Sequence, residues 1–426
     1  MKIGWLFRLP LSNRDLQCVE EKVMMLKKTT ELRTKTNPSI EGERTNETLE
    51  TIIKPLLFIL LFIGFFYIFA ERMGVGNMLN TMMQTAYRLL VDTCFYLMAV
   101  AVLAGAISAL LSEFGVVELV NRLLSPIMKP LFGMPGAASL GVVTTYLSDN
   151  PAIISLAKDK KFLKHFKEYQ VPALTNLGTS FGMGFIVTLF VLSQITIVGE
   201  DVAVSAVCGT LGAITGSIVS TRVMLYFTKK AVGTEQEAIL NELNVYQKEN
   251  EESKKSIFLR FLNCLTTGGK TGVDLGLEII PGVLIICTII MMMTYGPSSE
   301  GYTGSAFEGI ALLPALADLI KPVISALFGF SSSECIAVPI TAIGSSGASL
   351  SLITNLLKTG YANTQDLAVF NAICMCWSGY LSTHVAMMDS LNRTEYTGKA
   401  IFAHTLGGLA AGFTARWYFV FLSLVF

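Results

Sequence analysis

The stretch PIMKPLFG at residues 126–133 decides the fold, because its pattern returns as PVISALFG at residues 322–329. In both copies a proline precedes a Leu-Phe-Gly triplet by five residues, and the copies lie 196 residues apart. Further along, Asn176 recurs as Asn371, at an offset of 195. A register held by scattered Pro, Gly and Asn indicates a duplicated unit, since apolar composition alone would match only one aliphatic residue to another.

The composition is typical of a membrane protein. Hydrophobic residues make up 52% of the 426 residues and charged residues 15%, whereas about 25% of residues in soluble domains are charged. The mean hydropathy is +0.56. The net charge is zero, so no basic surface points to nucleic acid. We therefore expect an all-α polytopic membrane protein built from two repeats with broken or re-entrant helices, preceded by one extra transmembrane helix.

The apolar and charged segments divide the chain into five parts. We expect a soluble N-terminal arm at 1–50, the extra transmembrane helix at 51–70, a first repeat at 85–228, a charged cytoplasmic linker at 229–256 and a second repeat at 257–424. Apolar spans are expected in the first repeat near 89–111, 171–191 and 202–227, and in the second at 272–293, 309–330, 335–357, 367–388 and 400–422.

Lys and Arg gather in cytoplasmic loops of membrane proteins. Their distribution here favours a cytoplasmic N-terminus, provided that the segment at 137–156 enters and leaves the membrane on one side. Each repeat then crosses an odd number of times, so the two copies have inverted topology. The predicted location is the bacterial inner (plasma) membrane, with several passes.

Polar breaks interrupt an apolar segment in each copy, TTYLSDNP at 144–151 and GSSGAS at 344–349. They align at the offset of 196. Backbone that leaves helical geometry inside a membrane is tolerated only where protein or water covers it. The breaks therefore predict a central cavity for a small polar solute, although they would also suit caps of loops outside the bilayer. The predicted solute-binding residues here are Tyr146, Ser148, Asp149, Asn150, Ser345 and Ser346.

Three further groups of polar residues have two interpretations each. Ser332 and Glu334 follow the second Leu-Phe-Gly and either cap a helix or bind solute or a proton. Asn176 and Asn371 lie on predicted spans, where an amide suits a solute as well as it suits a neighbouring helix. His384 lies on a predicted span, where a histidine either titrates near neutral pH and so couples to protons or only packs. The residues expected to couple an ion to transport are Asp149, Glu334 and His384.

Metal chemistry and enzymatic chemistry have little support. The motif Cys374-x-Cys376 places its two thiols on different faces of a helix, and the run 291–293 of Met residues surrounds one. The chain has no Gly-Lys-Ser/Thr phosphate loop, no His-Glu-x-x-His motif and no Gly-x-Ser-x-Gly motif. We expect neither an enzyme, nor a cofactor, nor a resident metal.

The stretch LSPIMKPLFG at 124–133, followed by a small-residue helix, resembles the gate module of the nucleoside-recognition membrane protein family, as does 319–329. That module occurs in concentrative nucleoside transporters, in ferrous-iron transporter membrane domains and in the spore-maturation A and B proteins. Two tandem modules over 85–420 resemble a fused A and B pair. The resemblance implies transport of a nucleoside-like or other small polar solute, coupled to Na⁺ or H⁺.

The leading hypothesis is a secondary transporter that alternates access by moving one repeat against the other. Its partners would be the solute, Na⁺ or H⁺ and the lipid bilayer, without nucleic acid, and a homo-oligomer is possible. The alternatives are a membrane assembly or envelope-maturation protein that transports nothing, and a divalent metal transporter for iron.

Overall fold

The computed structural model describes residues 53–157, 160–238 and 256–425. The predicted N-terminal arm lies outside these residues, as does most of the predicted linker. The described residues form helices and no strand, with two isolated β-bridges. Five helical stretches among them are long and apolar enough to cross a membrane: Lys54–Met73, Val75–Glu113, Glu168–Val198, Val202–Val232 and Ile257–Thr294. The chain is an all-α polytopic membrane protein.

The chain separates into two compact units between Glu71 and Arg72. In the first, α3 (Lys54–Met73) is apolar over 20 residues and occupies the place of the predicted extra transmembrane helix. Phe58, Leu60 and Ile63 on it are more than half exposed, as suits a helix surrounded by lipid. All the contacts described below lie within the second unit.

The first copy begins with a long helix that contains a π-helical turn. It consists of α4 (Val75–Arg88), η2 (Leu89–Cys94), α5 (Phe95–Glu113), α6 (Val116–Phe132), α7 (Ala138–Leu147), α8 (Pro151–Leu156), α9 (Lys160–Leu163), η3 (Glu168–Gln170), α10 (Ala173–Thr179), α11 (Gly184–Ser193), α12 (Ile195–Val198) and α13 (Val202–Val232).

The second copy also has a π-helical turn in its first helix and ends, as the first does, on a long helix. It consists of α14 (Ile257–Gly282), η5 (Val283–Cys287), α15 (Thr288–Thr294), α16 (Leu312–Leu319), α17 (Lys321–Leu327), η6 (Ser333–Ile336), α18 (Ala337–Gly344), α19 (Ser346–Lys358), α20 (Thr364–Cys376), α21 (Tyr380–Ser390), η7 (Thr394–Tyr396) and α22 (Thr397–Val425).

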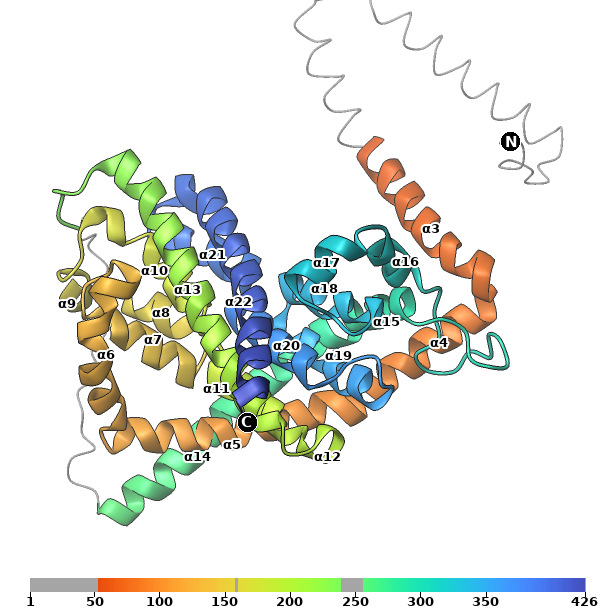
Figure 1. Ribbon diagram of the computed structural model, residues 1–426, viewed down its shortest axis with the longest axis horizontal. Helices are drawn as coiled ribbons and strands as arrows, with labels where there is room; N and C mark the ends of the chain where they lie inside the picture. Colours follow the sequence, from red (N-terminus) through yellow and green to blue (C-terminus); the bar gives the residue numbers. More distant parts are fainter. Residues whose placement is uncertain (1–52, 158–159, 239–255, 426) are drawn as a thin grey trace, which may run out of the picture. The chain divides into compact units, whose positions relative to one another are not determined.

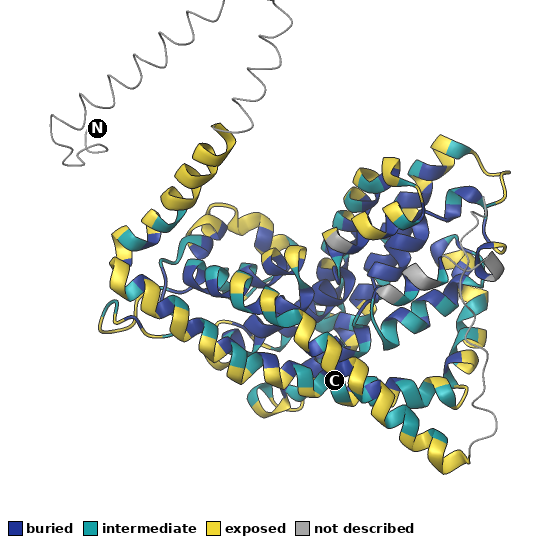
Figure 2. Ribbon diagram, turned by 180° about the vertical axis from the view of Figure 1, so that it is seen from behind, coloured by how far each residue is buried: buried dark blue, intermediate teal, exposed yellow. Residues whose placement is uncertain are grey.

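Equivalent helices of the two copies pack against each other in opposite directions. On α13 and α22, Gly216 approaches Gly407 while Gly212 approaches Ala411 and Ala415, so residue numbers rise on one helix as they fall on the other. Figure 1 shows these two helices side by side, and Figure 2 shows that buried residues gather in the interior of the helical bundle while exposed residues lie on its outside. The copies are therefore inverted with respect to each other, and small residues allow their backbones to approach closely, as is common between membrane helices.

A second antiparallel crossing joins α5 and α14. Gly105 faces Gly268, and Ala101 faces Gly272, so closely that a Cβ atom on either Gly268 or Gly272 would lie 2.3 Å from a backbone oxygen of α5. Glycines four residues apart on α14 thus form the flat face that this crossing needs.

The repeated Leu-Phe-Gly triplet ends a helix in both copies. Gly133 and Gly329 adopt φ angles of 71° and 64°, which glycine tolerates better than any residue with a Cβ atom. Their carbonyl groups accept hydrogen bonds from the side-chain amides of Gln170 and Gln365, at 3.1 and 2.9 Å. The two glutamines lie 195 residues apart, so the sequence repeat preserves this contact as well.

An arginine caps the same helix end in each copy. Arg222 on α13 donates from Nε to the carbonyl oxygen of Leu131 at 2.8 Å. Arg416 on α22 donates from Nη1 to the carbonyl oxygens of Ser325 and Ala326, at 2.6 and 2.9 Å. These guanidinium groups bond to carbonyls of the last helical turn, where backbone partners run out, although the Ser325 carbonyl also accepts from the backbone N–H of Gly329 at 3.0 Å.

The structure differs from the predicted spans in four places. The apolar segment 309–330 forms two helices of eight and seven residues, α16 and α17, each too short to cross a bilayer at 1.5 Å per residue. The predicted spans 171–191 and 367–388 are each broken, at 180–183 and 377–379. Residues at left-handed φ, Met183 at 55° and Gly379 at 63°, mark these breaks. Helix α13 also continues to Val232, inside the predicted linker.

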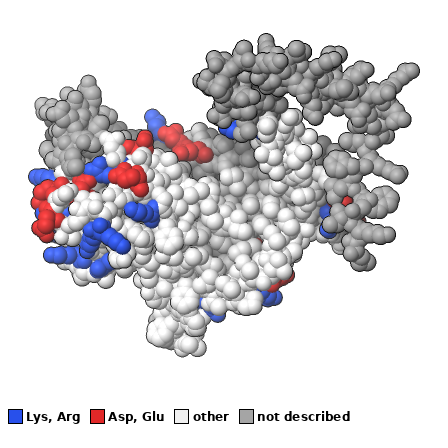
Figure 3. Space-filling model, turned by 90° about the horizontal axis from the view of Figure 1, so that it is seen from above, with Lys and Arg blue, Asp and Glu red and all other residues white. Residues whose placement is uncertain are grey.

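Charged side chains gather away from the apolar surface. Figure 3 shows one face of the molecule with a broad uncharged area and with Lys, Arg, Asp and Glu concentrated at one end of the view. Such an uncharged surface suits contact with the hydrocarbon core of a bilayer.

Candidate functional site

The two aligned polar breaks meet at one cavity of about 300 Å³, which we call the central cavity. The turn between α7 and α8 and the turn between α18 and α19 both contribute to its wall, together with α14 and the break before α21. We call α7 with α8 the first hairpin, α18 with α19 the second hairpin, and the two turns the hairpin tips. The lining residues are Asp149, Asn150, Met183, Leu275, Glu278, Ile279, Gly282, Gly344, Ser345, Ser346, Gly347, Ser378, Gly379, Thr383 and Ala386. Of the predicted binding residues, Asp149, Asn150, Ser345 and Ser346 lie here.

Asn150 lies between the broken helices of both copies. A Cβ atom on Gly182 would come within 2.1 Å of its Oδ1 atom, and one on Gly379 within 2.3 Å of its Nδ2 atom. Its Nδ2 group donates to Ser378 Oγ at 3.4 Å. Only glycine at these two positions leaves room for the amide, so the hairpin of the first copy touches the break in each copy through one side chain.

Several polar atoms of the central cavity have no hydrogen-bond partner within the described residues. They are Asp149 Oδ1, Asn150 Oδ1 and Ser346 Oγ, and the last two belong to side chains only 5% and 3% exposed. Asn150 therefore does not cap α8, whereas Ser345 does cap α19 by accepting from the backbone N–H of Ala348 at 3.2 Å. Buried polar atoms without partners are costly unless a ligand or water satisfies them.

Glu278 is a cavity residue that the sequence reasoning missed. It lies on α14, where Ile279 packs against Gly347 and Gly282 approaches Ser345. An acidic residue inside an apolar span is expensive unless it is used, and this rule, applied to the segment 272–293, would have found it. Ser378 and Thr383 add two hydroxyl groups to the same cavity.

Tyr146 and Ser148 lie beside the central cavity but do not line it. The Tyr146 hydroxyl bonds to Thr188 Oγ1 at 3.1 Å, and the Ser148 hydroxyl donates to the carbonyl of Thr144 at 2.7 Å. Their polar atoms are thus used within the first copy.

The paired asparagines bind helices of the opposite copy. Asn176 on α10 donates to the carbonyl of Ala400 on α22 at 2.9 Å, and also to Ser220 Oγ. Asn371 on α20 donates to the carbonyl of Ala206 on α13 at 2.9 Å. Neither asparagine lines the central cavity, and this arrangement matches the interpretation as helix-to-helix bonding.

Ser332 and Glu334 lie at the outer end of the second hairpin, around η6. Ser332 lines a small cavity together with Ser331 and Ser333, and its hydroxyl lies 3.7 Å from Cys335 Sγ. Glu334 is half-buried in the first turn of η6 and does not line the central cavity. The structure therefore does not bring these two residues to the hairpin tips.

His384 is buried one residue beyond the cavity residue Thr383, and it faces α22. Its Nδ1 bonds to the carbonyl of Tyr380, its Nε2 has no partner within the described residues, and its ring centroid lies 4.6 Å from that of His404. His404 is held by Ser220 Oγ and by the carbonyl of Cys376, at 2.9 and 2.6 Å. Because a carbonyl only accepts, His404 carries its proton on Nε2 and accepts from Ser220 at Nδ1.

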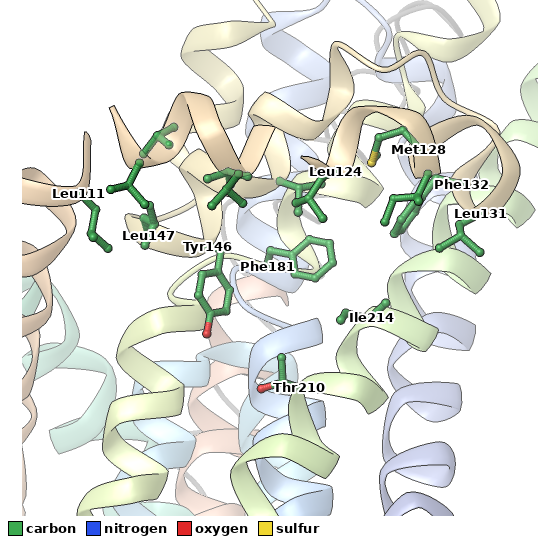
Figure 4. A pocket seen from close by; sticks show the side chains of 16 residues that line it. Leu111, Leu124, Met128, Leu131, Phe132, Tyr146, Leu147, Phe181, Thr210 and Ile214 are labelled. Atoms are coloured by element: carbon green, nitrogen blue, oxygen red, sulfur yellow. The ribbon is translucent and has the colours of Figure 1, made fainter. Parts of the chain in front are cut away.

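A second cavity, of about 310 Å³, is apolar and lies between α6 and the first hairpin. Figure 4 shows Leu124 and Met128 on α6 facing Tyr146, Phe181 and Ile214 across it. It offers no charged group to a polar solute. Within the described residues no group of three or more His, Cys, Asp or Glu side chains converges as a metal site would require.

Comparison with known proteins gives a fold and no family. No family model matches the chain, and no curated protein matches it. Among solved structures, the concentrative nucleoside transporter CNTnw in an inward-facing, substrate-bound state is 15% identical with a TM-score of 0.51, over 91% of this chain and 87% of that chain. A variant of CNTnw in an outward-facing state is 13% identical with a TM-score of 0.48, over 91% and 87%. The first likeness shows that the two chains share a fold.

Proposed function

We propose that the protein is a secondary transporter that binds a small polar solute in the central cavity and couples its movement to Na⁺ or H⁺. The observation that carries the proposal is the meeting of both polar hairpin tips at one cavity that contains unpartnered buried polar atoms. Inverted copies around such a site suit alternating access, in which one part moves against the other. The fold shared with a transporter that was solved with substrate bound supports the same reading.

The test uses the close approach of Asn150 to Gly182. Gly182→Ala places a methyl group where the Asn150 amide lies, 2.1 Å from its Oδ1, so it displaces the hairpin tip. Gly398→Ala is the matched control, because a Cβ atom there meets nothing within 4 Å. Uptake of labelled solutes into proteoliposomes, with a Na⁺ or a proton gradient, should fall at least tenfold in the first variant and stay unchanged in the second.

The alternatives make different predictions in the same assay. An assembly or envelope-maturation protein would show no solute-dependent uptake under any gradient, and Asp149→Ala would leave its cellular phenotype unchanged. An iron transporter would take up Fe²⁺ or Mn²⁺ and lose that uptake on substitution of Cys335 or Cys374. Either result would replace the proposed function.

A further inference from the structure

The wall of the central cavity is acidic. Two of its lining residues, Asp149 at the first hairpin tip and Glu278 on α14, carry carboxyl groups, and none is Lys or Arg. The nearest basic residue on α14, Lys270, lies eight residues before Glu278, about 12 Å along the helix at 1.5 Å per residue. Both carboxyl groups therefore belong to the wall of the same cavity.

The cavity also lacks the surface that a nucleobase uses. None of its lining residues is Phe, Tyr or Trp, whereas proteins that recognise single bases stack them on aromatic or guanidinium planes. Tyr146, the nearest aromatic residue in the first hairpin, faces the apolar cavity and bonds to Thr188.

The buried polar atoms of the central cavity are suited to a ligand that donates hydrogen bonds. Asn150 Oδ1, an acceptor, and Ser346 Oγ have no partner within the described residues, although both side chains are more than nine-tenths buried. A carboxylate accepts only, an amide oxygen accepts only, and a hydroxyl accepts as well as donates. A protonated amine offers up to three N–H donors and one positive charge. It therefore supplies both the hydrogen-bond donors and the positive charge that these acceptor atoms need.

We propose that the solute of the central cavity carries a protonated amine, held between the carboxylates of Asp149 and Glu278 and the acceptor atoms of Asn150 and Ser346. This inference rests on the proposed function and names its substrate class as small organic cations. A carboxyl oxygen of Asp149 is buried without a partner within the described residues, which is costly for a carboxylate, and a bound ammonium group removes that cost. Packing of Ile279 on Gly347 keeps Glu278 beside the second hairpin tip.

The experiment measures binding to the full-length protein in nanodiscs by thermal unfolding and by equilibrium titration. The probes are ethanolamine and putrescine as cations, ethylene glycol as the neutral analogue of ethanolamine, uridine, NaCl and MnCl₂. We compare Asp149→Asn and Glu278→Gln with Asp274→Asn, which removes an exposed carboxylate one turn away on α14 that does not line the cavity.

We expect the amines to raise the unfolding midpoint and ethylene glycol and uridine not to do so. Each cavity variant should weaken amine binding about tenfold or more, since a hydrogen bond to a charged group contributes about 1.5–3 kcal/mol, while Asp274→Asn should bind as the natural protein does.

Three results would overturn the inference. They are stabilisation by uridine but not by amines, stabilisation by Na⁺ or Mn²⁺ alone, and amine binding that survives both Asp149→Asn and Glu278→Gln. In the first case solute uptake would persist and the proposed function would stand. If no solute binds and no uptake occurs, both proposals fall. A cavity variant that fails to fold is recognised because its unfolding midpoint without ligand is lowered or absent. The other carboxylate variant then tests whether amine binding depends on the cavity.

Discussion

Replacing Arg393 with glutamine should lower the free energy of unfolding by about 3 kcal/mol, at the lower end of the range for breaking a buried ion pair. Arg393, in the turn after α21, donates from Nε to Glu168 Oε1 at 2.7 Å, and a second guanidinium nitrogen bonds to the same oxygen. The two side chains are only 17% and 6% exposed. The pair joins the second copy to the first, so its loss leaves a buried carboxylate without its guanidinium.

An exposed ion pair serves as the comparison for the stability that the buried ion pair contributes. Arg88 and Asp92 lie one helical turn apart at 3.6 Å, with side chains 58% and 56% exposed, and such pairs contribute about 0.3–0.5 kcal/mol. We would measure unfolding in mixed detergent micelles for Arg393→Gln, Glu168→Gln, the double variant and Arg88→Gln. The double variant should lose less than the sum of the two single losses. If Arg393→Gln costs no more than Arg88→Gln, the buried pair does not hold the copies together and the reasoning is refuted.

Two further predictions concern packing and pH. Gly268→Ala should cost about 1–3 kcal/mol by overpacking, because its Cβ atom would lie 2.3 Å from the Gly105 oxygen, whereas Gly269→Ala, whose nearest contact is an ordinary 3.6 Å, should be near neutral in the same unfolding assay. Burial by itself raises the pKa of Glu308, but hydrogen bonds from the Thr303 side chain and from the backbone of Thr303 and Gly304 lower it below its ordinary value. The stability that this carboxylate gives the loop is therefore present above the unfolded pKa of about 4.3 and lost as the pH falls through the lower pKa of the folded state. Protease cleavage of the loop should rise on acidification, and a Glu308→Gln variant that keeps the same pH dependence would contradict this.

The positions of the hairpin tips can be predicted from the sequence, whereas the roles of single polar residues cannot. A polar break in apolar sequence has few structural solutions in a membrane, so the alignment of 144–151 with 344–349 predicts that the two breaks share a cavity, and Asn150 and Ser346 do line one cavity. An asparagine amide has the same donors whether it meets a solute or a helix. The sequence therefore fits both a solute-binding and a helix-binding role for Asn176, and the bond of its amide to the Ala400 carbonyl supports the second.

Two other differences between the sequence-based prediction and the structure have different causes. Glu278 was missed because its span was judged by its apolar content, although one acid within such a span carries more information than the apolar residues around it. The high hydropathy of the segment 309–330 predicts a span, but the break at Ile320 divides the segment into two helices that are too short to cross a bilayer. Hydropathy measures preference for lipid, and it does not measure helix length.

The crossed amide bonds of Asn176 and Asn371 bear on how this chain is made. Each copy supplies a donor for a carbonyl on the other copy's last helix, so neither half satisfies its own interior when synthesised alone. Joining both halves in one polypeptide guarantees equal amounts of each. Two separate chains would have to be made in matched amounts, because a surplus half would bury an asparagine amide inside the bilayer without its acceptor, which costs free energy.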